Sequence, residues 1–227
     1  MTLKDKLIKI CKENATLYGF ASVEDYQDYM TDELKGYPHA IAIGMKIPDK
    51  IIDNIKSGRG ELDYQDTYNR LNKKLDDTTN KLENIIKKEG YQAKSVNASY
   101  IIPDGKLYGE LSHKMIANLA GLGWIGKSCL LITPEYGPRL RWATLLTDYD
   151  LEAENNPLNS RCNDCRLCVQ KCPSHALNDV EFRKEDPRSV RYDAFKCSRY
   201  FDKLESMNRP RLCGLCVKVC PWGKKSN

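Results

Sequence analysis

The spacing of hydrophobic residues divides the first 150 residues into alternating helices and strands. Apolar positions at helical spacing predict three amphipathic helices, each ending at a glycine: residues 3–17 (Gly19), 64–88 (Gly90) and 112–120 (Gly121). Short apolar runs predict four strands, at residues 40–44, 91–102, 129–133 and 142–147. A turn is predicted at residues 57–60. This mixture indicates an α/β or α+β fold.

The pattern changes beyond Asp150, where the chain becomes polar and Asn155 to Pro157 is predicted to be a linker. We therefore place one domain at residues 1–155 and a second at 156–227. No apolar run reaches the roughly 18–20 residues of a membrane helix. The charged N-terminal stretch does not have the pattern of a signal peptide. We expect a cytoplasmic protein that does not associate with a membrane.

Eight of the ten cysteines crowd into the second domain, between Cys162 and Cys220. In a reducing compartment such crowding indicates metal binding rather than disulfides. The first run, Cys162-x2-Cys165-x2-Cys168-x3-Cys172-Pro, has the spacing of bacterial ferredoxins. A second run repeats it with the first cysteine displaced upstream: Cys197, Cys213, Cys216 and Cys220. Cys11 and Cys129 stand apart, and we expect both to be ordinary buried thiols.

The two runs predict two [4Fe–4S] clusters with crossed ligands. Three closely spaced cysteines can reach one cluster, while the fourth is carried away by the following helix and points at the other. The predicted ligands of cluster 1 are Cys162, Cys165, Cys168 and Cys220, and those of cluster 2 are Cys172, Cys197, Cys213 and Cys216. Zinc is a weaker alternative because it prefers separated Cys-x2-Cys pairs.

The charge distribution fits this interpretation. Residues 1–150 hold equal numbers of basic and acidic residues, so residues 151–227 supply the whole formal net charge of +5. An oxidised [4Fe–4S] cluster with four thiolates carries about −2, and two of them would leave a net charge of about +1. We therefore interpret the basic excess as compensation for the clusters, and it is only weak support for nucleic-acid binding.

A glycine-rich loop at residues 121–128 formally satisfies two phosphate-binding patterns, G-x4-G-K-[ST] and G-x-G-x-x-G. Both patterns require a strand before the loop and a helix after it. Here a predicted helix precedes the loop and a predicted strand follows it, so we do not expect nucleotide binding. The alternatives are a tight helix-to-strand turn and a loop whose exposed amides admit a bulky planar cofactor. The second interpretation is preferred.

Residues 112–134 (SHKMIANLAGLGWIGKSCLLITP) resemble the core motif of epoxyqueuosine reductases, cobalamin-dependent double [4Fe–4S] enzymes of tRNA modification that are related to reductive dehalogenases. The resemblance continues through the two cysteine runs, and it is weaker in the N-terminal part. The matching stretches are residues 145–148, 193–197 and 213–222, and more weakly 37–43 and 63–64. It therefore covers most of the chain, densely from residue 112 onward.

The resemblance implies a nitroreductase-like domain that holds cobalamin, followed by a bacterial two-[4Fe–4S] ferredoxin-like domain. Electrons would pass through the clusters to cobalt and then to a substrate. The expected donor is a ferredoxin or flavodoxin, and tRNA or a corrinoid protein is the expected partner. The positions expected to contact the cofactor are Gly121, Leu122, Gly123, Trp124, Ile125, Gly126, Lys127 and Thr133.

Three departures leave the reaction open. The acidic proton donor of those reductases falls near Leu107 here, where the nearest acids are Asp104 and Glu110. Tyr64-Gln65 replaces a Tyr-His pair, and those reductases are longer. The candidate catalytic residues are therefore Tyr64, Asp104 and Glu110. The alternative function is an electron-transfer protein that reduces a partner's corrinoid and has no substrate of its own. A flavin in place of cobalamin is a further alternative.

Overall fold

The computed structural model describes residues 1–55 and 60–224, which form two compact units. The first unit contains residues 1–46, 70–122 and 141–158, and the second contains 47–69, 123–140 and 159–227. The predicted division at residues 155 and 156 differs from this arrangement, because two earlier segments join the cysteine segment in the second unit. A domain boundary at that point stays a prediction. The turn predicted at residues 57–60 lies, apart from Gly60, outside the described residues.

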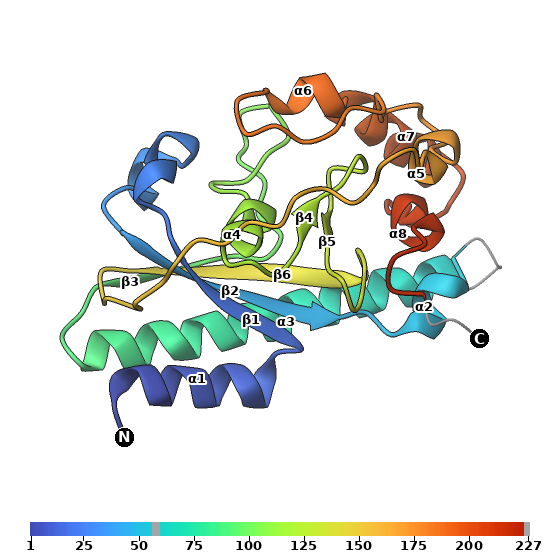
Figure 1. The fold of residues 1–227 in the computed structure, drawn as a ribbon. Helices are drawn as coiled ribbons and strands as arrows, with labels where there is room; N and C mark the ends of the chain where they lie inside the picture. Colours follow the sequence, from blue (N-terminus) through green and yellow to red (C-terminus); the bar gives the residue numbers. More distant parts are fainter. Residues whose placement is uncertain (56–59, 225–227) are drawn as a thin grey trace. The chain divides into compact units, whose positions relative to one another are not determined.

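A four-stranded sheet forms the centre of the first unit, in the order β1-β2-β6-β3 (Figure 1). Its strands are β1 (Leu17–Ser22), β2 (His39–Lys46), β3 (Ala93–Val96) and β6 (Leu140–Thr147). β1 pairs antiparallel with β2, and β3 pairs antiparallel with β6. Two 3-10 helices, η1 (Glu24–Tyr29) and η2 (Asp32–Leu34), precede β2.

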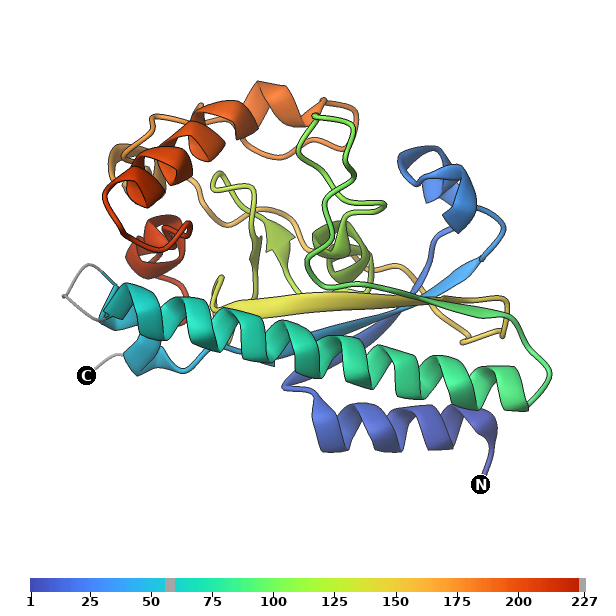
Figure 2. The ribbon, with the colours of Figure 1, turned by 180° about the vertical axis from the view of Figure 1, so that it is seen from behind.

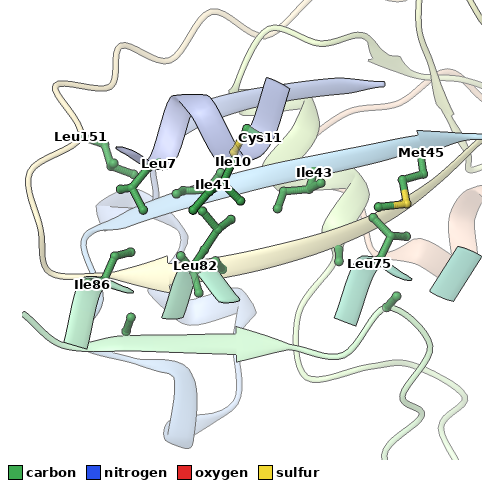
Figure 3. Packing of buried hydrophobic residues seen from close by; sticks show 14 residues of the cluster. Leu7, Ile10, Cys11, Ile41, Ile43, Met45, Leu75, Leu82, Ile86 and Leu151 are labelled. Atoms are coloured by element: carbon green, nitrogen blue, oxygen red, sulfur yellow. The ribbon is translucent and has the colours of Figure 1, made fainter. Parts of the chain in front are cut away.

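Helices cover both faces of this sheet. α1 (Leu3–Asn14) and α3 (Gly60–Lys88) lie on one face, and α4 (His113–Leu119) lies on the other (Figures 1 and 2). Alternate residues of β2, such as Ile41 and Ile43, pack against Leu7 of α1 and Leu82 of α3 (Figure 3). Burial of these apolar side chains is the main force that holds the layers together. The period of two along β2 explains how one strand serves both faces.

Strand β1 was not predicted, because its Gly19 was interpreted as a helix terminus. The helix instead ends earlier, where Ala15 adopts an extended conformation. Gly19 lies within the strand, and a Cβ on it would approach the Cβ of Ala120 to 2.9 Å. The glycine is thus explained by the close approach of a neighbouring segment and not by a helix cap.

The predicted strand at residues 91–102 is shorter in the structure, where β3 ends at Val96. The backbone N–H of Ala98 donates to the Asp76 carboxylate at 2.8 Å, and the carbonyl of Asn97 pairs with His113 at 3.0 Å. These side chains take over the backbone groups that a longer strand would pair, so the chain leaves the sheet. The long helix and the strands β2 and β6 are confirmed.

The second unit consists of short elements joined by loops. Its helices and strands are α2 (Asp49–Asp53), β4 (Trp124–Ile125), β5 (Leu131–Ile132), α5 (Leu167–Gln170), α6 (Arg188–Arg191), α7 (Ala194–Ser206) and α8 (Leu215–Val219). The first residues of α3, as far as Asn69, also belong to it. Three side chains tie its segments together. Lys218 donates to the Ile55 carbonyl at 2.7 Å, Arg209 pairs with Glu61, and buried Arg139 pairs with Asp53 at 2.8 Å.

Candidate iron–sulfur and cofactor site

The eight clustered cysteines lie on three short helices and the loops beside them. Cys168 is on α5, Cys197 on α7 and Cys216 on α8, and α5 packs against α8. All eight are partly exposed. Cys11 and Cys129, which lie outside the two runs in the sequence, are buried. α8 begins after Gly214, which adopts a left-handed conformation, and α7 begins after Asp193, whose carboxylate accepts from the Lys196 N–H.

One group of thiols gathers around Cys220. Its pKa is raised to about 12, first by burial and then by the charges of three other cysteines: Cys162, Cys168 and Cys165. Burial, followed by the charge of Cys162, also raises the pKa of Cys168 to about 11. The last cysteine of the second run is therefore close to the first three of the first run.

A second group gathers around Cys216. Burial raises its pKa most, followed by the charges of Cys213, Cys197, Cys168 and Cys172. The pKa of Cys197 is likewise raised by burial and by the charge of Cys172. The neighbourhoods follow the predicted crossed sets, with Cys168 close to both. Their assignment as ligands stays a prediction.

Hydrogen-bond donors already point at several of these sulfurs. The backbone N–H of Ala176 donates to Cys172 Sγ at 3.4 Å. The Tyr192 hydroxyl bonds Cys197, and this contact lowers the pKa of the thiol while burial raises the pKa of the tyrosine. The backbone N–H of Trp222 bonds Cys220. Such donors favour the thiolate form that metal ligation requires.

The glycine-rich loop folds into a tight hairpin in which β4 pairs antiparallel with β5. A Cβ on Gly123 would lie 2.2 Å from the Ile132 carbonyl oxygen. A Cβ on Gly126 would lie 2.8 Å from the Ile132 side chain and 3.3 Å from Cys162 Sγ. Both glycines are therefore required by contacts within the chain. A strand follows the loop in this fully described stretch, as expected, so neither phosphate-binding pattern has its helix.

Lys127 and Trp124 of this loop are buried. The Lys127 ammonium donates to the Asn163 carbonyl at 2.7 Å and lies 3.2 Å from Asp179. Trp124 meets the ring of Trp222 edge-on, with centroids 4.7 Å apart. Its indole Nε1 is buried and finds no hydrogen-bond partner among the described residues. The described residues therefore provide no hydrogen-bond acceptor for this buried indole N–H.

The other predicted cofactor contacts differ in exposure. Gly121 and Leu122 are partly exposed, whereas Ile125 is buried. Thr133 is fully buried, and its hydroxyl donates to the Gly137 carbonyl and accepts from the N–H of Tyr136. Most of the loop therefore contacts its own chain, and the N–H groups of Gly121 and Leu122 donate to the carbonyls of Asn118 and Ala117. Cofactor binding by the loop stays a prediction.

The three candidate catalytic residues occupy different settings. Tyr64 is only 5% exposed, and its ring lies edge-on to Tyr68 in the second unit. Asp104 is exposed in a turn of the first unit, where a hydrogen bond from the N–H of Lys106 lowers the pKa of its carboxyl group. Glu110 is partly exposed in the same loop. Their roles in proton transfer stay predictions.

Sequence reasoning did not identify three residues that shape the site. Tyr192 and Ala176 donate to cysteine sulfurs, and Arg139 is a buried charge of the second unit that is only 1% exposed. The carboxylates of Asp49 and Asp53 balance its charge at 3.0 and 2.8 Å. Their acidic spacing on one helical turn was the signal that could have been used.

Comparison with known proteins finds similarity both in the cysteine-rich last third and over most of the chain. Residues 161–223 match the 4Fe-4S double cluster binding domain family. An epoxyqueuosine reductase from Bacillus anthracis is 29% identical over 203 residues, which cover 84% of this chain and 50% of the relative. The chain spans about half the length of the curated relatives it matches. Within the described residues, no helix has the length and hydrophobicity needed to cross a membrane.

Two solved structures show the same fold. Epoxyqueuosine reductase from Streptococcus thermophilus matches with a TM-score of 0.64 and 19% identity, over 100% of this chain and 68% of that one. A reductive dehalogenase, described with a mechanism for B12-dependent dehalogenation, matches with a TM-score of 0.73 and 21% identity over 96% of this chain and 31% of that one. The predicted α/β fold class and the family resemblance are both confirmed. The chain is similar to epoxyqueuosine reductases over most of its length, and its residues 161–223 match the 4Fe-4S double cluster binding domain family.

Proposed function

We propose that the protein is an iron–sulfur oxidoreductase that passes electrons through two [4Fe–4S] clusters to a bound cobalamin, for the reduction of a substrate. The observation that carries this proposal is the grouping of eight cysteines into two neighbourhoods that draw on both runs. The match of residues 161–223 to double-cluster domains supports it. In this role the protein resembles epoxyqueuosine reductases, of which the chain spans about half the length.

The residues present fit two clusters. We propose Cys162, Cys165, Cys168 and Cys220 as ligands of cluster 1, and Cys172, Cys197, Cys213 and Cys216 as ligands of cluster 2. When bound, such clusters supply one-electron carriers. The chain's own part is to hold the sulfurs, direct N–H and O–H groups at them and exclude water. The unpaired indole N–H of Trp124 is available to an acceptor that the polypeptide itself does not provide.

The cobalamin proposal rests on the resemblance to epoxyqueuosine reductases and on the fold shared with a B12-dependent dehalogenase. Within the glycine loop, the partly exposed Gly121 and Leu122 are the residues best placed to contact it. The buried residues from Gly123 to Lys127, with Thr133, would hold the loop in its conformation through contacts with their own chain. When bound, cobalamin would supply a metal centre that can be reduced at low potential.

For the remaining chemistry, we propose that an acid in the loop carrying Asp104 and Glu110 supplies the proton, with Tyr64 as the alternative donor. The epoxyqueuosine reductase relatives make modified tRNA the first substrate to test. A cytoplasmic location and a ferredoxin or flavodoxin donor complete the proposal.

The crossed ligand sets are tested by removing one cysteine at a time. Protein purified and reconstituted without oxygen should contain about eight iron and eight sulfide per chain. Cys220→Ser should abolish the same EPR signal as Cys162→Ser and leave the signal that depends on Cys213. Cys11→Ser is the matched control and should keep the full iron content. If Cys220→Ser instead abolished the Cys213-dependent signal, each run would bind its own cluster and the crossed sets would be wrong.

Cobalamin is tested separately. Added to the anaerobic protein, it should change its absorption and EPR spectra as it binds, and the loaded protein should then convert epoxyqueuosine in tRNA. If cobalamin binds without that conversion, the substrate is another molecule. If no cobalamin binds while both clusters are present, the cobalamin proposal fails, and the electron-transfer and flavin alternatives remain to be tested.

A further inference from the structure

The lysine that completes the phosphate-binding pattern has a different environment from the one that the pattern suggests. Lys127 is 7% exposed, and its ammonium group lies inside the second unit. It donates to the Asn163 carbonyl at 2.7 Å and lies 3.2 Å from Asp179 and 3.9 Å from Glu181. Burying an ammonium group costs desolvation free energy, which its three oxygen partners must offset. A buried lysine therefore requires a role other than keeping the surface soluble.

These contacts place the lysine beside the first cysteine of the first run. Asn163 directly follows Cys162 and adopts a left-handed conformation with φ of 44°. The glycine preceding the lysine faces the same cysteine, since a Cβ on Gly126 would lie 3.3 Å from Cys162 Sγ. Burial acts to lower the pKa of Lys127, but Asp179, Glu181 and, to the smallest extent, the charge of Cys162 raise it above its ordinary value. The glycine-rich loop therefore packs directly against Cys162.

We propose that Lys127 is a positioning residue for cluster 1, which holds the Cys162 loop through Asn163 and raises the reduction potential of the cluster with its positive charge. The proposal rests on the two clusters of the proposed function. Reduction adds one negative charge to a cluster, and a nearby buried cation stabilises that charge. The carboxylates of Asp179 and Glu181 fix the ammonium group and offset part of its field.

A purely structural lysine and a charge-bearing one predict different results. Lys127→Met keeps most of the length of the side chain and removes its charge. We expect about eight iron per chain and an equilibrium constant for reduction of cluster 1 that is about tenfold lower, equivalent to about 59 mV for one electron. Cluster 2 should change much less. Lys127→Arg keeps the charge and should stay near the wild-type potential.

Variants of the counter-charges test the sign of the effect. Asp179→Asn and Glu181→Gln each remove a negative charge from the same group, so each should raise the potential of cluster 1. Potentials are measured by anaerobic redox titration followed by EPR, with iron and sulfide counted in the same samples. This series remains informative if Lys127→Met fails to fold.

The outcomes separate this proposal from the one on which it rests. Wild-type protein without two EPR-active clusters would overturn the proposed function and this inference together. Two clusters in the wild type, with no shift in Lys127→Met or with equal shifts in both clusters, would overturn only the role of Lys127. Lower potentials in Asp179→Asn and Glu181→Gln would do the same.

Discussion

Gly214 is a position where a single methyl group should damage the cysteine unit directly. It lies between Cys213 and Cys216, directly precedes α8 as its N-cap and has φ of 70°. A Cβ here would lie 2.4 Å from Tyr64 Cε1 and 2.8 Å from Ile55 Cδ1. Both neighbours are buried, at 5% and 1% exposure, so neither ring nor methyl group has free space to move into.

The expected cost of Gly214→Ala has two parts. A non-glycine residue in the left-handed conformation costs about 1–2 kcal/mol, and overpacking a filled site costs about 1–3 kcal/mol. Gly105 isolates the first part, because its φ is 77° and, apart from its chain neighbours, no described heavy atom lies within 4 Å of an added Cβ. Gly214→Ala should therefore be less stable than Gly105→Ala by about 1–3 kcal/mol.

Anaerobic urea denaturation of the two variants and the wild type, with clusters loaded, measures this difference. We expect a lower midpoint for Gly214→Ala, together with loss of the EPR signal that depends on Cys213 before the other signal. Equal midpoints for the two alanine variants would refute the packing argument and leave backbone conformation as the whole effect.

Three further predictions concern residues outside the proposed ligand sets. Burial lowers the pKa of His113 to about 4. Because this value lies below the pKa of an unfolded histidine, the contribution of His113 to stability should be fully present above about pH 6.5. It should decrease as the pH falls toward 4, by at most about 3 kcal/mol. Urea midpoints measured between pH 4 and 8 should show this pH dependence in the wild type and lose it in His113→Gln. Arg139→Met should cost about 1–3 kcal/mol, because it leaves Asp49 without its buried partner, and thermal melting of Arg139→Lys should show a smaller loss because the charge remains. Replacing Cys11 and Cys129 together by alanine should leave about eight iron per chain by colorimetric assay, and a clear decrease would show that the ligand count is wrong.

The cysteine neighbourhoods could be predicted from sequence because short loops leave little choice of position. Between Cys162 and Cys168 the spacing alone brings three sulfurs together, and Cys220, the last cysteine of the second run, is the natural fourth member. Residue patterns also predicted α3 and β2, since long amphipathic helices and buried strands have strong periodicities.

What could not be predicted depends on distant contacts. Gly19 has the same sequence signal as a helix terminus, and only its approach to Ala120 explains why it lies in a strand. The environment of Lys127 is set by Asp179, which is remote in the sequence. Local patterns contain no information on such pairs, so the packing of the glycine loop on its own chain could not be predicted.

The neighbourhood of Cys220 with the first three cysteines has a consequence for biosynthesis. A ribosome adds about 5–20 residues each second, so roughly 3–12 seconds separate the synthesis of Cys162 from that of Cys220. During that interval three thiols of the first group are present without their fourth member. Such a trio is exposed to oxidation and to the wrong metal, and we expect the iron–sulfur assembly machinery to act only after Cys220 has been synthesised.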